Sequence, residues 1–312
     1  MRHTKKKTVT EKSYFCSMKA PNNRTLDVKE EEREVLLPLV DGKFLIHGDT
    51  LSVLDTLPDG FANLIIVDPP YNLAKDFGDK KFTPLAPHEY EEYLRSWFHR
   101  LCDKLAPNGS LYMCGDWRCS SSMQRVIEER LTILNRITWQ REKGRGAAHN
   151  WKNSMEDIWF AVKNPHDYYF NLEAVKQRRR VLAPYRQDGQ PKDWEETQDG
   201  RFRTTCPSNF WDDISVPFWS MPENTNHPTQ KPEKLIAKLI LASSQEGDMV
   251  FDPFLGSGTT AVVAKKLGRR YCGIELNLDY CLLAAKRLLL ADQDSTIQGY
   301  TDGVFWERNS GK

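Results

Sequence analysis

The sequence predicts an α/β protein whose core is a doubly wound, mostly parallel sheet. Two observations support this fold class. Over residues 42–163, and again over 226–294, short runs of branched apolar residues alternate with amphipathic segments of helix length. Where these runs end, Gly, Pro, Asn and Asp mark turns. Such alternation is typical of βαβ units, in which the strands are parallel and helices cover the sheet.

The first part of this alternation follows a polar leader. Residues 1–41 carry the charge run DVKEEERE and little apolar periodicity, so we expect a flexible arm. The pattern then predicts a strand, a short helix, a strand, a helix, a strand and a helix, at 43–49, 50–60, 62–68, 88–105, 109–116 and 121–131. The runs 133–140 and 155–163 have no helix between them, which favours an antiparallel pair at one sheet edge.

The pattern breaks at residues 164–225, which are rich in Pro, Gln, Arg, Trp and Asp and predict an irregular insertion. It resumes over residues 226–294 with a helix, a strand, a helix, a strand and a helix, expected at 232–244, 248–254, 258–268, 269–276 and 277–292. Residues 295–312 are expected to form a tail.

Composition narrows the class of protein. The chain has 312 residues, a formal net charge of +1, 28% charged residues and 39% hydrophobic residues, enough for a sizeable core. No apolar run approaches 18 residues and no apolar region follows the basic N-terminus, so we expect a cytoplasmic protein with no membrane contact. The seven cysteines form no Cys-x-x-Cys pair, which predicts reduced thiols and no metal site.

A glycine turn follows the predicted strand at 248–254. In VFDPFLGSGTT the chain passes Gly256, Ser257 and Gly258 before a helix begins, so a ligand could approach the backbone closely. A plain tight connection fits this turn equally well. The next strand ends at Glu275, which should lie beside the turn and could accept hydrogen bonds from both ribose hydroxyls. Together they favour a nucleoside cofactor, with a solvated acid at a helix start as the alternative for Glu275.

The stretch LIIVDPPYNL predicts a group of acceptors at the end of a strand. Pro69 and Pro70 fix the backbone and remove amide donors, which leaves the carboxylate of Asp68 and a neighbouring carbonyl facing the crevice. This arrangement suits a group with two N–H bonds, such as an amino group on a base, while Tyr71 could cover a planar ring. Two prolines after a strand are also compatible with a simple turn.

Three motifs in this order resemble a known family. DPPYNL, NHPTQKPEKLIAKLILAS and DPFLGSGTTAVVAKKLG are similar to motifs of the S-adenosylmethionine-dependent DNA amino-methyltransferases of the permuted beta group, N6-adenine type, found in restriction-modification systems. The resemblance covers about residues 42–292. It implies a Rossmann-like methyltransferase fold with a catalytic half at 42–163, a target-recognition insertion at 164–225 and a cofactor half at 226–294.

The resemblance implies S-adenosylmethionine as the cofactor. It assigns the ribose to Glu275, the adenine edge to Asp49 and the methionine end to the residues around the glycine turn. Lys231, in the HPTQKP box, is also compatible with a solvated position at a helix start. The expected cofactor contacts are Asp49, Thr229, Lys231, Asp252, Phe254, Gly256, Ser257, Gly258 and Glu275.

The resemblance further implies a catalytic set of Asp68, Pro69, Pro70 and Tyr71. Asp68 and the Pro69 carbonyl would accept the two N–H bonds of the target amine and direct its lone pair at the methyl group, while Tyr71 stacks on the flipped base. An Asp at the first position favours N6 of adenine, and N4 of cytosine is the nearest alternative. Methylation of RNA or of a protein amide, or a catalytically silent DNA-binding protein, are more distant alternatives.

Local basic patches are expected to hold double-stranded DNA on a chain that is nearly neutral overall. The expected contacts are Arg141, Lys143, Arg145, Lys152, Arg178, Arg179 and Arg180. Trp151 and Trp194 could add base contacts, although a solvated irregular subdomain would explain the same composition. The resemblance also allows a cognate restriction endonuclease, a homodimer and a location on the nucleoid.

Overall fold

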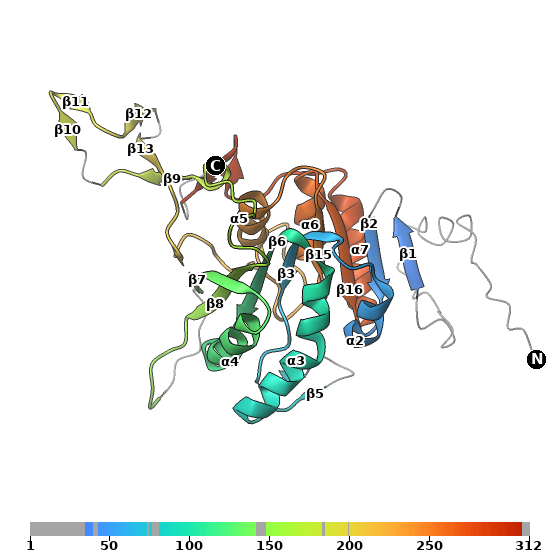
Figure 1. The fold of residues 1–312 in the computed structure, drawn as a ribbon. Coiled ribbons are helices and arrows are strands. Elements are labelled where there is room, and N and C mark those ends of the chain that lie inside the picture. The colour runs from blue at the N-terminus through green and yellow to red at the C-terminus, as the bar shows by residue number, and fades with distance from the viewer. Residues whose placement is uncertain are drawn as a thin grey trace, which may run out of the picture. The chain divides into compact units, whose positions relative to one another are not determined.

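Figure 1 shows the chain as a computed structural model, which describes residues 35–39, 43–73, 75–76, 81–141, 148–182, 185–198 and 200–307. The helices in these ranges are α2 (Thr50–Val53), α3 (Pro87–Lys104), α4 (Trp117–Glu128), α5 (Glu233–Ser243), α6 (Thr259–Lys266) and α7 (Leu278–Leu290), with 3₁₀ turns at Leu54–Thr56 and Glu173–Val175. The predicted helix at 121–131 begins earlier, at Trp117, because the Asp116 carboxylate caps it by accepting the Arg118 amide at 2.9 Å.

The main sheet has nine strands in the order β1-β2-β16-β15-β3-β6-β8-β7-β14. Their bounds are β1 (Val35–Leu39), β2 (Lys43–His47), β3 (Ala62–Val67), β6 (Leu105–Gly115), β7 (Thr132–Gln140), β8 (Met155–Val162), β14 (Phe210–Trp211), β15 (Met249–Asp252) and β16 (Arg270–Glu275). The run from β2 to β6 is parallel, and β8 is antiparallel to both β6 and β7. The prediction of a mostly parallel sheet with an antiparallel pair is therefore confirmed.

Side chains from alternate strand positions build a core on each face of the sheet. One face packs Ile65 and Val67 of β3 with Leu94 of α3 and Val126 of α4. The other face meets α5, where the Tyr112 hydroxyl lies 2.8 Å from the hydroxyl of a serine near the helix end. Figure 1 shows α3 and α4 on one side of the sheet and α5, α6 and α7 on the other. Parallel strands buried on both faces read as continuous apolar runs, which explains the sequence pattern.

The neighbouring positions of β3 and β15 create the site. Leu64 pairs with Val250 and Ile65 with Phe251, so two motifs that are far apart in the sequence leave the sheet side by side. Because parallel strands end at the same edge, the segments after β3 and β15 meet in the crevice at their carboxyl ends.

A second sheet was not predicted. It has the order β12-β13-β9-β18-β17 and combines the insertion with the tail. Its strands are β9 (Gln177–Arg180), β12 (Glu195–Thr197), β13 (Gly200–Thr205), β17 (Tyr300–Thr301) and β18 (Val304–Trp306). The insertion thus holds regular strands where irregular structure was expected, and the tail is paired with β9. These strands are short, and apart from β18 (VFW) they are largely polar, so no apolar periodicity marks them.

Two short antiparallel ladders lie outside the two larger sheets, and a further strand covers each edge of the main sheet. The ladders pair β4 (Lys75–Asp76) with β5 (Lys81–Phe82), and β10 (Arg186–Gln187) with β11 (Gln190–Pro191). At one edge, β1 forms from residues assigned to the flexible leader and pairs antiparallel with β2. At the other edge, β14 of the insertion covers β7. Among the described residues, none of the helices combines the length and hydropathy that a membrane crossing requires.

Candidate active site

Four acidic residues converge at one edge of the main sheet. Asp49, Asp68, Asp252 and Glu275 stand at the carboxyl ends of β2, β3, β15 and β16, and all four line one cavity of about 610 Å³. This volume lies within the range of small-molecule sites. The predicted site residues in its wall are Asp49, Asp68, Pro69, Pro70, Tyr71, Thr229, Lys231, Asp252, Phe254, Gly256, Ser257 and Glu275.

The glycine turn adopts a conformation that requires glycine. Gly256 and Gly258 have φ of 54° and 82°. A Cβ on Gly256 would lie 3.0 Å from the His227 ring, and one on Gly258 would lie 2.5 Å from the Ala284 Cβ of α7. Gly258 is the one predicted cofactor residue that lies outside the cavity wall, and it caps α6 instead. Both glycines are therefore required by their backbone conformation and by close packing, Gly256 against His227 of the cavity wall and Gly258 against α7.

Glu275 organises this turn through its side chain. One carboxylate oxygen accepts the Gly256 amide at 2.7 Å and the other accepts the Asn277 amide at 2.8 Å. Burial raises the pKa of the Glu275 carboxyl, and these amide donors oppose the rise. Each carboxylate oxygen has two lone pairs, so this geometry still leaves acceptor capacity toward the cavity.

Asp252 and Asp49 hold the two neighbouring strand ends. Asp252 is buried, and its oxygens accept the Thr260 hydroxyl at 2.6 Å and the Phe254 amide at 3.0 Å. Burial raises the pKa of Asp252 to about 7. Asp49 caps α2 by accepting the Leu51 amide at 2.9 Å.

A compact polar cluster surrounds Asp68. The Tyr71 hydroxyl donates to Asp68 Oδ1 at 2.7 Å, and Lys231 Nζ donates to Asp68 Oδ2 at 2.6 Å. Lys231 Nζ also lies 3.1 Å from the Tyr71 hydroxyl and 3.4 Å from Glu156 Oε2. Lys231 was predicted as a cofactor contact; its ammonium lies on the carboxylate of the predicted catalytic residue.

Burial and charge fix the protonation of this cluster. Burial acts to lower the pKa of Lys231, but the carboxylates of Asp68 and Glu156 outweigh it and raise that pKa above its ordinary value, so the side chain is a cation. Burial raises the pKa of Tyr71 well above 10, which keeps its hydroxyl a hydrogen-bond donor. Burial likewise raises the pKa of the Cys114 thiol in the cavity wall, so this cysteine is neutral.

The two prolines differ in their surroundings. The Pro70 carbonyl accepts the Tyr90 hydroxyl of α3 at 3.1 Å. Within the described ranges, no group donates a hydrogen bond to the Pro69 carbonyl. The prediction that an acceptor carbonyl accompanies Asp68 in the crevice is therefore compatible with the geometry at Pro69.

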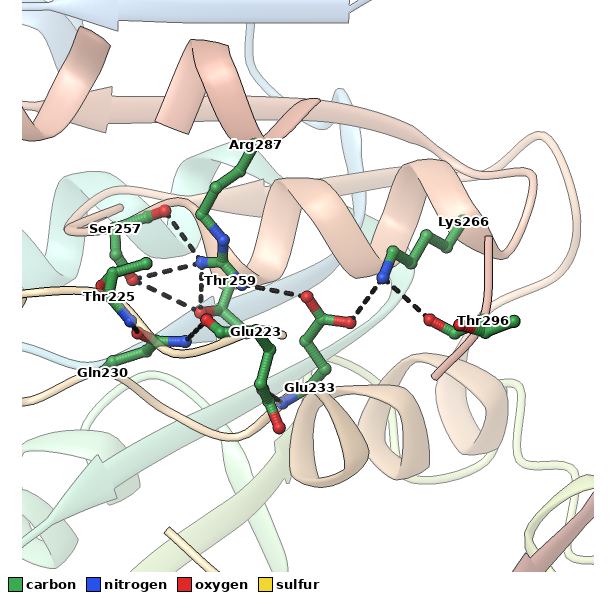
Figure 2. A network of polar contacts seen from close by, with 9 residues as sticks. All are labelled: Glu223, Thr225, Gln230, Glu233, Ser257, Thr259, Lys266, Arg287 and Thr296. Atoms are coloured by element: carbon green, nitrogen blue, oxygen red, sulfur yellow. Dashed lines mark hydrogen bonds and ion pairs between the residues drawn. The ribbon is translucent and has the colours of Figure 1, made fainter. Parts of the chain in front are cut away.

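The HPTQKP box is tied to the glycine turn by the network in Figure 2. Gln230 donates to the Glu223 carbonyl at 2.6 Å and accepts the Thr225 hydroxyl at 2.6 Å. Arg287 of α7 donates to the Ser257 carbonyl at 2.9 Å and pairs with Glu233 of α5 at 2.9 Å. Glu223 Oε2 also accepts the Glu233 amide at 2.7 Å, so Gln230 of the box is linked through Glu223, Glu233 and Arg287 to Ser257 of the turn.

The predicted DNA contacts fall into different environments. Arg141 pairs with the buried Glu156 at 2.5 Å and is about one third exposed, whereas Lys152 is exposed. Lys143 and Arg145 lie outside the described residues. Trp151 is 92% exposed, but Trp194 is buried and its indole N–H donates to the Tyr185 carbonyl, so Trp194 is not available to contact a base in this structure.

The three predicted arginines of β9 lie in the second sheet. Arg178 pairs with Glu195 at 2.5 Å, and its guanidinium lies 5.3 Å from the ring centroids of both Phe202 and Trp306. Arg179 pairs with Asp212 at 3.4 Å, and Arg180 is exposed. Both Arg178 and Arg180 lie over Phe202, with the Arg180 guanidinium 5.8 Å from the ring centroid, and Arg180 is the more exposed of the two.

Sequence reasoning missed Glu156 and Cys114. Glu156 is 4% exposed and contacts Lys231, Tyr71 and Arg141. A signal was present, since this acid opens the apolar strand MEDIWFAV, and a charge buried in such a strand requires a partner. Its partners come from three separate segments, which the sequence pattern does not connect.

The chain is similar to known DNA methylases in sequence and in fold. Residues 62–286 match the family model N6_N4_Mtase, described as DNA methylase. The chain is 34% identical over 266 residues to the DNA adenine methyltransferase YhdJ of Escherichia coli (strain K12), covering 82% of this chain and 85% of the relative. It is 33% identical over 258 residues to the type II methyltransferase M.HpaI of Haemophilus parainfluenzae, covering 82% and 76%. The crystal structure of the M1.HpyAVI–SAM complex aligns with a TM-score of 0.51 and 25% identity, over 78% of this chain and 98% of that one.

Proposed function

This chain belongs to the DNA methylase family, and from that premise we propose that its cavity binds S-adenosylmethionine next to a flipped-out base of duplex DNA. The protein is a site-specific, adenine-specific DNA methyltransferase that methylates the N6 amino group. The observation that carries this function is that Asp68 and the glycine turn line the same cavity.

The volume of the cavity and the acidic acceptors in its wall suit a nucleoside cofactor. At Gly256 a Cβ would come within 3.0 Å of the His227 ring, so the packing of this turn against the cavity wall depends on glycine. Glu275 would hold the ribose, Asp49 the adenine edge and the turn the methionine end. When bound there, S-adenosylmethionine supplies an electrophilic methyl group. The assignment of these contacts is supported by their common position at the carboxyl ends of the parallel strands.

The chemistry assigned to the chain is orientation of the amine. The Asp68 carboxylate and the Pro69 carbonyl would each accept one N–H bond of the adenine amino group, which draws its lone pair out of conjugation and toward the methyl group. Tyr71 would cover the flipped ring, while its hydroxyl braces Asp68 at 2.7 Å. The neutral Cys114 thiol takes no part in this step.

Residues 164–225 are proposed to read the DNA sequence, and exposed basic residues to hold the phosphates. Lys152, which is exposed beside Trp151, is the clearest candidate. Replacing Lys152 with Ala should lower the slope of log affinity against log salt by about 1, because one phosphate contact and its released counterion are lost. Replacing the packed Arg178 with Ala should instead lower thermal stability. Equal salt slopes for Lys152→Ala and wild type would remove Lys152 from the DNA surface.

The deciding experiment is mass spectrometry of nucleosides from unmethylated genomic DNA after incubation with the protein and S-adenosylmethionine. N6-methyladenine should form with wild type and be absent with Asp68→Ala, whose cofactor affinity should stay within about threefold of wild type. Sequencing of the modified positions then gives the recognition site. N4-methylcytosine would overturn the base assignment, and the absence of any methylated base despite bound cofactor would overturn the DNA substrate.

Relatives with type II names motivate the proposal of a cognate restriction endonuclease that shares the recognition site. A homodimer is a second, separate proposal. A DNA substrate also implies a nucleoid-associated location. Once the recognition site has been sequenced, the first proposal is tested by cleavage: an endonuclease that shares the site should cut unmethylated DNA and should not cut DNA methylated by this enzyme. Sedimentation with and without a duplex tests the second.

A further inference from the structure

Both carboxylate oxygens of Asp68 already have partners in this structure. Tyr71 donates to Oδ1, and Lys231 donates to Oδ2 at 2.6 Å. The proposed function requires the adenine amine to donate to the same carboxylate. An incoming amine would therefore have to share an oxygen with an ammonium or displace it.

Lys231 lies between two carboxylates. Its ammonium is 2.6 Å from Asp68 Oδ2 and 3.4 Å from Glu156 Oε2, and its side chain is 8% exposed. Glu156 is also buried, and its other oxygen accepts Arg141 at 2.5 Å. The carboxylate nearer to Lys231, that of Asp68, is the one that the substrate amine needs. The farther carboxylate, that of Glu156, is already within ion-pair distance of Lys231.

We propose that Lys231 is a placeholder cation that holds Asp68 before the base enters and moves onto Glu156 when the amine takes its place. Glu156 is then a positioning residue for the methylation, since it acts on the substrate only through Lys231. This inference rests on the proposed function of Asp68.

Charge balance makes such an exchange physically reasonable. An unpaired buried charge costs several kcal/mol, so the ammonium of Lys231, at 8% exposure, needs a carboxylate partner both before the base enters and after the neutral amine has taken its place on Asp68, whose side chain is 23% exposed. Two carboxylates face Lys231, and an ammonium has three donors, so the shift replaces one ion pair with another. The titratable groups that contact the Asp68 carboxylate are Tyr71 and Lys231. Of these, Lys231 is the cation.

The test compares two duplexes that carry the sequenced recognition site, one with adenine and one with purine at the target position. Purine lacks the amine, so the ratio of the two dissociation constants, measured with S-adenosylhomocysteine bound, reports the contact between the amine and Asp68. In Glu156→Gln the lysine loses its second carboxylate, and the preference for adenine should fall about tenfold, the worth of one hydrogen bond to a charged group. In Glu156→Gln combined with Lys231→Met, no ammonium competes with the amine for Asp68 Oδ2, and the preference should return to within about threefold of wild type.

The rescue separates this role from a purely structural one. If Glu156→Gln lowered the preference for adenine only by disturbing the structure, a second buried substitution would leave the preference equally low or lower it further. A double variant whose preference for adenine is no higher than that of Glu156→Gln therefore overturns the proposal. An unchanged preference in Glu156→Gln also overturns it. Glu92→Gln and Lys286→Met make the same substitutions at exposed positions and control for composition.

Folding and cofactor binding are checked by thermal unfolding and by the affinity for S-adenosylhomocysteine. If Glu156→Gln does not fold, Glu156→Asp keeps the charge on a shorter side chain and should lower the preference at least threefold; no change there would overturn the proposal. A wild-type enzyme that does not methylate adenine contradicts the proposed function itself. A wild type that methylates adenine without the rescue contradicts only the role of Lys231 and Glu156.

Discussion

Gly258 shows how a single residue can support the cofactor turn without touching the cavity. Its φ is 82°, and an added Cβ would lie 2.5 Å from the Ala284 Cβ of α7. We expect Gly258→Ala to lower the free energy of unfolding by about 2 to 4 kcal/mol, from backbone strain and overpacking together, and to weaken S-adenosylmethionine binding. Urea unfolding and calorimetric titration measure the two effects.

Gly60 provides the matched control. Its φ is 66°, but an added Cβ there meets nothing within 4 Å. Gly60→Ala should therefore cost only the backbone strain of about 1 kcal/mol and leave cofactor affinity unchanged. Equal losses of stability in the two variants would mean that packing against α7 contributes nothing.

Glu223 links stability to pH. Burial raises its pKa from 4.5 to about 7, and the nearby Glu233 carboxylate adds to the rise. Between these values the folded state binds more protons than the unfolded state, so the contribution of Glu223 to stability is complete below pH 4.5 and is lost as pH rises through 7.

Glu223→Gln should remove this dependence, because a glutamine can still accept the Glu233 amide (2.7 Å from Glu223 Oε2) but does not titrate. The free energy of unfolding of wild type minus that of the variant should fall by up to about 1.4 kcal/mol per pH unit between pH 4.5 and 7. Urea unfolding at several pH values measures the difference. Asp252 titrates in both proteins and cancels, so parallel curves would refute the role of Glu223.

Individual site residues were predictable where a strand ended in a distinctive turn. Asp68, Asp252 and Glu275 each close an apolar run, and a parallel sheet brings such ends to one edge. Glu156 was not predictable in this way, since its position in the site depends on β8 pairing with β6 and on Lys231 arriving from another segment. The contact of Lys231 with Asp68 has the same origin.

Strands followed from the sequence only where their side chains are apolar. β3 and β15 read as buried runs, but β9 has the sequence QRRR, which carries no alternation of apolar and polar residues. The β9 strand is held in place by partners elsewhere in the chain, since Phe202 on β13 and Trp306 on β18 flank Arg178. A strand held by cation–π contacts from distant segments leaves no local periodicity to read.

The pairing of β9 on both sides predicts the effect of removing the tail. β13 and β18 flank β9, and Lys234 of α5 donates to the Trp306 carbonyl. A chain that ends at Asp294 should expose β9 as an edge strand, so its amides should exchange faster with deuterium and DNA affinity should fall. S-adenosylmethionine affinity should stay within about twofold of the full chain, because none of the described tail residues, 295–307, lines the cavity.

A chain that ends at Glu307 is the control, since it keeps β17 and β18. It should match the full-length protein in both exchange and DNA binding. Unchanged exchange of the β9 amides in the shorter chain would show that β13 is sufficient to hold the strand.

The segments 42–163 and 226–294, proposed as the catalytic and cofactor halves, share one sheet, so we expect them to form a single folding unit despite the insertion between them. β3 of the catalytic half lies between β15 of the cofactor half and β6, so separation of the halves would cut through the hydrogen-bonded core. Cofactor binding at the carboxyl edge should therefore stabilise both halves together. At a concentration 100 times its dissociation constant, S-adenosylmethionine should add about 2.7 kcal/mol and raise the melting temperature by about 5 to 10 °C.

Hydrogen exchange distinguishes this coupling from a local effect. With the cofactor bound, amides of β3 and β15 that exchange by global unfolding should gain equal protection, because one opening event exposes both strands. The β9 amides serve as the internal comparison, since they lie in the second sheet and should gain less. Protection confined to β15 and β16 would mean that the cofactor half opens independently. In that case the pairing of β3 with β15 would align the two motifs, but the segments that carry them would unfold independently.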